Sequence, residues 1–397
     1  MSRSCSVSID HLSEADLGTW TCRIHHSASK QFQEAHFQVT LPKEDVYVRL
    51  PTNIKPSRYE VYLVPFIIPD NFTISGNVNI NINISEPTTN ITLHIYDMTI
   101  HEDESRLVLA EDGSEVSITG HGYDEFRQFY ILQLGQELSS TLVNLTIRWT
   151  GNLNDELAGF YRSSYTDEEG NKQYIATTQF EATDARRALP CFDEPAMKAV
   201  FQVNLGRVPE MSSTSNMPVK EAGVAIGDTG YVWDKYEDSL RMSTYLLAFI
   251  VSDFVYRTAE PTDNGVEFRI WSRQSAEDQT EWAADIGPRI LAYYETYFDT
   301  PFPLPKQEMI AIPDFSAGAM ENWGLITYRE TALLYQPGVS SLSDKEYVAV
   351  VVAHELAHQW FGDLVTMEWW TDLWLNEGFA RSEKLCKISR LSLLADN

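Results

Sequence analysis

The sequence is poor in cysteine and in basic residues. Its 397 residues include four cysteines, and no two of them form a Cys-x-x-Cys pair. A zinc site built from cysteines, or a dithiol redox motif, is therefore not expected. Lysine and arginine number 30 against 57 aspartates and glutamates, which gives a formal net charge of −27. Such acidity argues against nucleic-acid binding, because phosphates are repelled, and it favours cationic partners such as the ammonium end of a peptide.

The sequence also lacks a long apolar run at its Met1 end, so it predicts neither a signal peptide nor a membrane anchor there. Four Asn-x-Ser/Thr sequons nevertheless occur in one strand-rich stretch, at Asn71, Asn83, Asn90 and Asn144. Such triplets are common by chance, but their clustering favours N-glycosylation and an extracellular or cell-surface location. Because a glycosylated protein needs a leader, we expect the natural N-terminus to lie outside this sequence.

Residues 1–45 are the first of three predicted regions. "SVSIDHLSEADLGTWTCRI" and "QEAHFQVTL" alternate apolar and polar residues, which predicts strands. The Asp-x-Gly-x-Trp-x-Cys run that ends at Cys22 resembles the late strands of an immunoglobulin domain. That pattern also needs an earlier cysteine on the facing sheet, and Cys5 is too close in sequence for this. We predict a partial immunoglobulin-like segment, with an unrelated hairpin as the alternative.

The second and third regions differ in periodicity. From residue 46 to 252, runs such as "VNININI" and "LVNLTIRWT" alternate with period two, which predicts a large antiparallel β-sheet domain. From residue 253, "SAEDQTEWAADIGPRILAYYETYF" and "SDKEYVAVVVAHELAHQWFGD" have helical spacing, around a short strand in "FPLPKQEMIAI". Ser343 or Asp344 is the expected N-cap of the second helix, and Gly362 follows its last turn. The predicted fold class is α+β.

One predicted helix carries a metal-binding pattern. In "AHELAHQW", His354 and His358 are four residues apart, which places both imidazoles on one face. Glu355 points about 100° away from His354, where it can contact a water on the metal without ligating it. Glu377 follows on the next predicted helix. Two imidazoles, one carboxylate and an open fourth position are typical of catalytic zinc, whereas a structural zinc or simply packed histidines are the alternatives.

With this zinc pattern, the sequence resembles the aminopeptidase N family of zinc metallopeptidases, within the gluzincins. The matching blocks are "HELAHQWFGDLVTMEWWTDLWLNEGFA", "GAMENWGLITYRE", "TTQFEATDARRALPCFDEPAMKAVF", "YLLAFIVSDF" and "GFYRSSY". The resemblance covers about residues 46 to 380. It implies a β-sheet domain followed by a thermolysin-like catalytic domain, one bound zinc ion, and removal of residues from the free N-terminus of peptides.

The resemblance also implies roles for residues around the predicted zinc site. An exopeptidase must hold the substrate ammonium at a fixed distance from the cleaved bond, and Glu321 of the Gly-Ala-Met-Glu-Asn segment can bind it through a charge-assisted hydrogen bond. Glu181 is implied as a second amine-binding carboxylate and Gln179 as a wall of the pocket for the first side chain. The backbone of Gly318 and Ala319 could pair with the substrate as an added strand. The alternative for Glu321 is a solvated loop acid.

The implied mechanism uses Glu355 as the general base, which takes a proton from the zinc-activated water and hands it to the leaving amine. After Ala380 the chain reads "RSEKLCKISRLSLLADN", which departs from the family. We therefore expect a truncated catalytic domain over residues 253–397, with residues 381–397 as an unrelated tail. The family's oxyanion-binding tyrosine lies downstream, and no tyrosine here matches its position. Two functions stay open: a zinc aminopeptidase, or a catalytically impaired fragment or splice form that binds zinc and peptide without efficient turnover.

Overall fold

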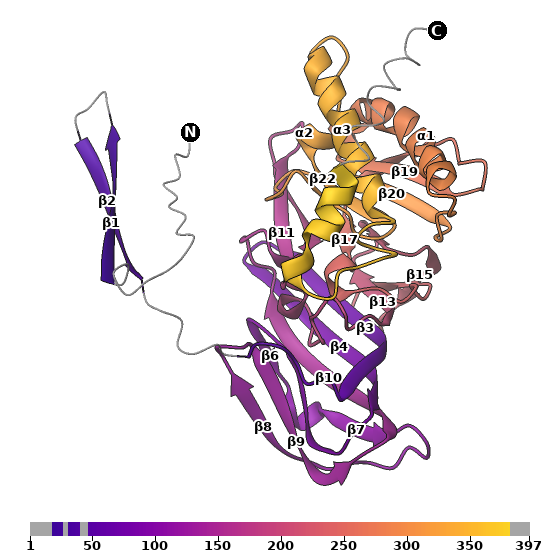
Figure 1. The fold of residues 1–397 in the computed structure, drawn as a ribbon. Helices are drawn as coiled ribbons and strands as arrows, with labels where there is room; N and C mark the ends of the chain where they lie inside the picture. Colours follow the sequence, from indigo (N-terminus) through magenta and orange to yellow (C-terminus); the bar gives the residue numbers. More distant parts are fainter. Residues whose placement is uncertain (1–17, 27–30, 40–46, 382–397) are drawn as a thin grey trace. The chain divides into compact units, whose positions relative to one another are not determined.

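The computed structural model describes residues 18–26, 31–39 and 47–381, and the chain divides into two compact units, Met1–Arg49 and Leu50–Asn397 (Figure 1). In the first unit, β1 (Gly18–His26) and β2 (Gln31–Val39) form an antiparallel hairpin. The strands expected from the alternating pattern are therefore present. The immunoglobulin-like character stays a prediction, because Cys5 and the other residues of 1–17 lie outside the described residues.

An eight-stranded sheet forms the largest element of the second unit. Its strand order is β15-β16-β13-β3-β4-β10-β6, with β7 paired to β10. Its strands are β3 (Ile54–Ile68), β4 (Asn71–Ile84), β6 (Met98–Ile100), β7 (Arg106–Leu109), β10 (Thr141–Asn152), β13 (Val200–Arg207), β15 (Val219–Ala225) and β16 (Val232–Tyr236). Alternate residues of β3 and β4 are buried, as the period-two pattern predicts for strands with one face on a core.

One strand pair departs from the predicted antiparallel sheet. β13 pairs with β3 in parallel, with Val203 opposite Val61. A parallel pair requires a long crossover connection. Here the strands β4 to β12 lie between β3 and β13 in the sequence. Alternation of apolar residues is the same in parallel and antiparallel strands, so the sequence pattern could not give the direction of this pair.

Two smaller sheets complete the β-rich part of the second unit, which runs from β3 to β17 (residues 54–252). A three-stranded sheet has the order β5-β9-β8, formed by β5 (Thr88–His94), β9 (Phe129–Leu138) and β8 (Ile118–Asp124). A four-stranded sheet has the order β11-β12-β17-β14, formed by β11 (Gly159–Thr166), β12 (Lys172–Gln179), β17 (Phe249–Ser252) and β14 (Ser212–Ser215). The 3-10 helices of this part are η2 (Glu102–Glu104), η3 (Ala185–Arg187) and η4 (Thr244–Leu246).

The remainder of the second unit is a five-stranded mixed sheet with helices. The strand order is β18-β19-β20-β22-β21, formed by β18 (Val255–Ala259), β19 (Glu267–Ser272), β20 (Lys306–Ile312), β22 (Leu325–Arg329) and β21 (Ala319–Met320). The helical segments are η5 (Gln274–Thr280), α1 (Glu281–Tyr297), α2 (Glu330–Leu333), α3 (Leu342–His358), η6 (Trp370–Asp372) and a helix over residues 374–381. α1 contacts α3, β18 and β19, and these elements lie at the opposite end of the second unit from β8 and β9 (Figure 1).

The N-cap of the long helix α3 lies two or three residues earlier than predicted. Its N-cap is Ser341, whose Oγ accepts a hydrogen bond from the Asp344 backbone N–H at 3.1 Å. Asp344 is the third helical residue and its carboxylate accepts in return from the Ser341 backbone N–H at 2.7 Å. The prediction of Ser343 or Asp344 as N-cap was therefore wrong, because this reciprocal capping box pairs residues three apart and Asp344 is its second member. The buried Val348, Val352 and Leu356 fix the inner face of the helix.

A second apolar core cluster joins the four-stranded and five-stranded sheets. It includes Ile175 of β12, Tyr245 of η4, Ile310 of β20 and Met320 of β21, together with Met367 from the segment after α3. Burial of this set packs η4 and β12 against the five-stranded sheet and the segment that follows α3.

Two remaining predictions concern the surface. Among the sequon asparagines, Asn71 and Asn83 are exposed, whereas Asn90 and Asn144 are partly buried. Among the residues that the structure describes, no helix combines the length and apolar character that crossing a bilayer requires.

Candidate metal centre

The two histidines of α3 face each other at a short distance. Their Nε2 atoms are 3.2 Å apart and their ring centroids 4.5 Å apart. The Nδ1 of His358 lies 2.9 Å from the backbone oxygen of Phe361, to which it can donate a hydrogen bond. That bond places the proton on Nδ1 and leaves the lone pair of Nε2 free, which is the tautomer that a metal ligand needs.

Glu377 completes a three-residue cluster from the helix over residues 374–381. Its Oε2 is 3.3 Å from His354 Nε2 and its Oε1 is 3.8 Å from His358 Nε2. The three candidate ligand atoms all lie within 4.8 Å of one another. Ligand atoms roughly 2 Å from a shared tetrahedral zinc are themselves roughly 3.3 Å apart. The donor set and its spacing therefore fit zinc, with one coordination position left open.

The electrostatics of the cluster also fit a cation. The two imidazoles hold the pKa of Glu377 well below its usual range. Burial alone would lower the pKa of His358, but the surrounding carboxylates, Glu321 first among them, raise it well above its usual value. The site thus has more negative than positive groups, which a divalent cation would balance.

Glu355 is buried on α3, with its Oε2 lacking a hydrogen-bond partner. Burial raises the pKa of Glu355 well above its usual value; His358 opposes this rise and Glu321 adds to it. A buried carboxylate with raised proton affinity, coupled to the metal-binding cluster, has the properties that a general base requires.

The predicted exopeptidase segment lies directly beside the cluster. Glu321 is buried, and its Oε1 is 3.7 Å from His358 Nδ1 and has no hydrogen-bond partner. The side chain of Gln359, the residue after His358, donates to the Glu321 backbone oxygen at 3.0 Å and accepts from the Gly324 N–H at 3.2 Å. Gln359, which sequence reasoning gave no role, therefore joins this segment to the end of α3.

Gly318 and Ala319 lie at an open sheet edge. Within the described part of the chain, β21 pairs only with β22, with Ala319 opposite Tyr328, and Gly318 accepts a hydrogen bond from the Arg329 N–H at 2.9 Å. Gly318 is exposed and Ala319 partly buried. An extended peptide can add to such an edge through main-chain hydrogen bonds.

The β-rich part contributes Gln179 and Glu181. Gln179 is the last residue of β12, and its buried Oε1 has no hydrogen-bond partner. The pKa of Glu181 is raised to about 8 by burial first and then by the charges of Glu321 and Glu377. Glu181 therefore lies close enough to the cluster to sense its charges, although the two segments are far apart in sequence.

Three further residues at this site were missed by the sequence analysis. Asp363 is fully buried and neither of its carboxylate oxygens has a hydrogen-bond partner. Burial first and then the charge of Glu321 raise its pKa well above the usual value. The other two are Tyr245, within the quoted "YLLAFIVSDF" block, and Asn376, which directly precedes Glu377. Their sequence neighbours were the only available signal, because their contacts come from distant segments.

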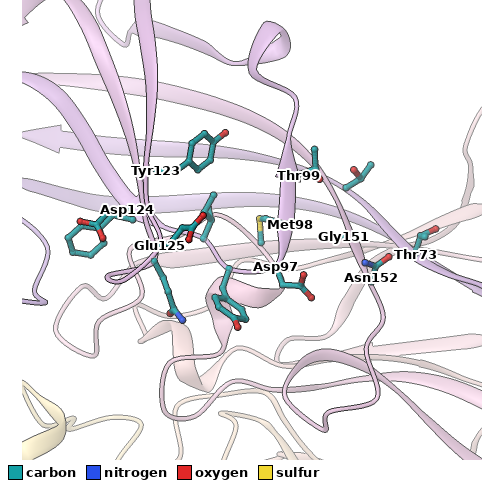
Figure 2. A pocket seen from close by; sticks show the side chains of 14 residues that line it. Thr73, Asp97, Met98, Thr99, Tyr123, Asp124, Glu125, Gly151 and Asn152 are labelled. Atoms are coloured by element: carbon teal, nitrogen blue, oxygen red, sulfur yellow. The ribbon is translucent and has the colours of Figure 1, made fainter. Parts of the chain in front are cut away.

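A cavity of about 690 Å³ opens elsewhere, among β4, β6, β8, β9 and β10 of the β-rich part (Figure 2). Asp97, Asp124 and Glu125 lie around it with Tyr123 and Met98. None of the predicted site residues lines this cavity. The cavity is thus separate from the candidate metal centre.

Two family models match most of the second unit. Residues 55–246 match the Peptidase M1 N-terminal domain and residues 282–391 match the Peptidase family M1 domain. The second match runs past Ala380 into residues 381–391 of the predicted unrelated tail, residues 381–397, of which 382–397 lie outside the described residues.

Similar proteins include several aminopeptidases. Endoplasmic reticulum aminopeptidase 1 of Rattus norvegicus is 42% identical over 343 residues, which is 86% of this chain and 36% of the relative. Aminopeptidase Ey of Gallus gallus is 46% identical over 344 residues (84% and 35%), and aminopeptidase N of Bos taurus is 42% identical over 343 residues (84% and 35%). The chain thus spans about a third of the length of these relatives. The two domain matches and these identities show that the chain belongs to the M1 family of aminopeptidase N-like zinc metallopeptidases.

Proposed function

We propose that this chain carries the zinc site of an aminopeptidase that removes residues from the N-terminus of peptides. The observation that carries the proposal is the convergence of His354, His358 and Glu377 on one small volume. The relatives named as aminopeptidases support the reaction class. One zinc ion is proposed, held by these three side chains.

Glu355 is the proposed general base of the reaction. Bound zinc would lower the pKa of a water and polarise the carbonyl of the first peptide bond. The Glu355 carboxylate accepts the proton of that water and passes it to the leaving amine. Its burial keeps bulk water away from the carboxylate, so its proton affinity is set by the site rather than by solvent.

The substrate amine is proposed to bind Glu321 and Glu181. Both carboxylates belong to the electronegative group around the cluster, so an ammonium ion would find charge complementarity there. The peptide backbone is proposed to align along β21, at Gly318 and Ala319. Gln179, with its unpartnered side-chain oxygen, is proposed to line the pocket for the first side chain.

The finer features of the architecture are part of the same proposal. We propose a β-sheet domain over residues 46–252 and a thermolysin-like catalytic domain from residue 253, preceded by an immunoglobulin-like segment over residues 1–45. An extracellular or cell-surface location is proposed from the exposed sequons at Asn71 and Asn83. One similar protein is named for the endoplasmic reticulum, so passage through that compartment agrees with this proposal.

The test is hydrolysis of an aminoacyl chromogenic amide by the purified full chain, together with its zinc content. We expect one zinc per chain and hydrolysis that a chelator abolishes and added zinc restores. The N-acetylated amide is the matched control and should not be cleaved, because it has no ammonium for Glu321 and Glu181. Zinc binding without chelator-sensitive hydrolysis would favour the alternative of a binding protein without efficient turnover, and a chain that binds no zinc would contradict both.

A further inference from the structure

The turn that follows α3 presents two consecutive backbone carbonyls to different partners. The oxygen of Phe361 lies 2.9 Å from Nδ1 of His358, whose Nε2 is one of the three candidate ligand atoms. The oxygen of Gly362 accepts a hydrogen bond of 3.0 Å from the hydroxyl of Tyr245. The same turn therefore orients one ligand and is itself held from the β-rich part of the molecule.

Tyr245 reaches the other ligand segment with the same hydroxyl. Asn376 Nδ2 donates to the Tyr245 oxygen at 3.1 Å, and Asn376 directly precedes Glu377. The Tyr245 ring packs edge-on against Trp370 with centroids 5.2 Å apart. Tyr245 and Asn376 are each about 1% exposed, so neither partner is replaced by bulk water.

The geometry of the turn leaves little freedom. Gly362 has φ 138°, in a region that favours glycine, and an added Cβ would lie 3.4 Å from Asn376 Nδ2 and 3.3 Å from the His358 backbone oxygen. A second side chain from the β-rich part also holds this turn, because Lys198 Nζ donates to the backbone oxygen of Asp363 at 3.0 Å. The turn is thus fixed on one side by the β-rich part and on the other by Asn376.

Among the described residues, the helix over residues 374–381 has two other anchors: Ala380 in the main apolar core, and the ring of Phe379, which stacks on Phe361 with centroids 4.9 Å apart. Only Asn376 and Ala380 are buried in it, whereas Trp374 and Phe379 are exposed. The side chain of Glu377 is itself 47% exposed. The hydrogen bond from Asn376 to the Tyr245 hydroxyl, which itself donates to Gly362, therefore helps to fix where Glu377 lies.

We propose that Tyr245 is a positioning residue that sets Glu377 relative to His358 by joining Asn376 to the turn after α3. The inference rests on the proposed zinc function and adds a residue that is not one of the three candidate ligands. It predicts that the affinity for zinc depends on a tyrosine hydroxyl supplied by the β-rich part. Outer contacts that orient metal ligands typically change metal affinity by about 10–100-fold.

The experiment measures the zinc dissociation constant of the full chain by chelator competition, for wild type, Tyr245→Phe, Asn376→Ala and the double variant. We expect each single variant to weaken zinc binding by about tenfold or more. The double variant should be no weaker than the weaker single variant, because both substitutions break the same connection. Tyr236→Phe is the matched control: Tyr236 is a buried tyrosine in β16 whose hydroxyl bonds Ser213 Oγ at 2.7 Å, and zinc affinity should be unchanged.

The free energy of unfolding of the metal-free variants is measured as well. It separates an effect on the position of Glu377 from a general loss of stability. An unchanged zinc affinity in Tyr245→Phe, with or without a loss of stability, would overturn the inference while leaving the proposed function intact. If Tyr245→Phe does not fold, Asn376→Ala decides the matter in the same way. A wild-type chain that binds no zinc would instead contradict the proposed function itself.

Discussion

Two buried clusters of charged side chains in this molecule differ in how they are satisfied. In β20, the Lys306 ammonium donates to the Ser215 oxygen at 2.7 Å, to the Gly324 oxygen at 2.9 Å and to Glu308 Oε2 at 3.2 Å. Glu308 also accepts from the Thr214 hydroxyl. Every charge in this cluster has partners within the chain, as expected for buried ions that serve the fold.

At the candidate metal centre several buried charged groups have no hydrogen-bond partner on at least one atom. Glu321 Oε1, Glu355 Oε2 and both oxygens of Asp363 are buried without a hydrogen-bond partner. His354 Nδ1 is also without one. Unpartnered buried charges of one sign are costly unless a ligand completes them. The comparison teaches that a lack of hydrogen-bond partners for buried charged groups distinguishes a binding site from a structural ion pair in this fold. Burial or charge alone does not make this distinction.

The largest effect is expected at the open cluster, from Glu355→Gln. The variant keeps the three proposed ligands and so should retain zinc, while loss of the general base should lower kcat by about 10²–10⁴-fold. Zinc content and the rate of amide hydrolysis are measured on the same preparation. Full activity of this variant would show that Glu355 is not the base.

A matched pair of substitutions then compares the two clusters directly by urea unfolding of the metal-free protein. Glu308→Gln should lower the free energy of unfolding by about 3–5 kcal/mol, because it leaves Lys306 buried without its carboxylate. Glu321→Gln should be neutral or stabilising, because it removes one of several like charges. If both variants lost similar stability, the distinction between satisfied and open clusters would not hold.

The pH dependence of the metal-free protein sharpens the same contrast. The folded-state pKa of Glu181 is about 8 against an ordinary value of 4.5. Between these two values the folded state keeps a proton that the unfolded state has lost, so stability falls as the pH rises through this window. Within this window, Glu181 lowers the free energy of unfolding by up to about 1.4 kcal/mol for each unit of pH increase. Urea titrations between about pH 5 and pH 8 should show a shallower slope for Glu181→Gln, and an equal slope would speak against the raised pKa.

The smallest effect is expected at an exposed polar contact that belongs to neither cluster. Ser341→Ala removes the N-cap of α3 and should lower the free energy of unfolding by about 1 kcal/mol without changing kcat. Ser343→Ala, two residues further, is the control and should cost less, because Ser343 does not cap the helix. Thermal unfolding of both variants measures the difference, and equal losses would argue against the capping box at Ser341.

The parts of the site that depend on local spacing could be predicted from the sequence. His354 and His358 face each other because they are four residues apart on a helix, and Glu377 follows on the next helix. Glu321 and Glu181 were placed by family resemblance, and the structure brings both into the electrostatic field of the cluster.

The contacts between distant segments could not be predicted. Tyr245 meets Gly362 and Asn376 because the second core cluster packs η4 against the five-stranded sheet and the segment after α3, and no local pattern encodes that packing. The parallel pairing of β3 with β13 was missed for the same reason, since strand direction is a property of the whole topology. The N-cap of α3 was misplaced because Ser341 and Asp344 act as a pair.

The most direct measurement of the central claim is a calorimetric titration of the metal-free chain with zinc. We predict one tight site per chain, lost or greatly weakened in Glu377→Gln, and unchanged in the control Glu368→Gln, which alters an exposed carboxylate of the segment between α3 and the following helix. Absence of binding in the wild type, or equal affinity in Glu377→Gln, would contradict the proposal that the open cluster of α3 and the following helix is a zinc site.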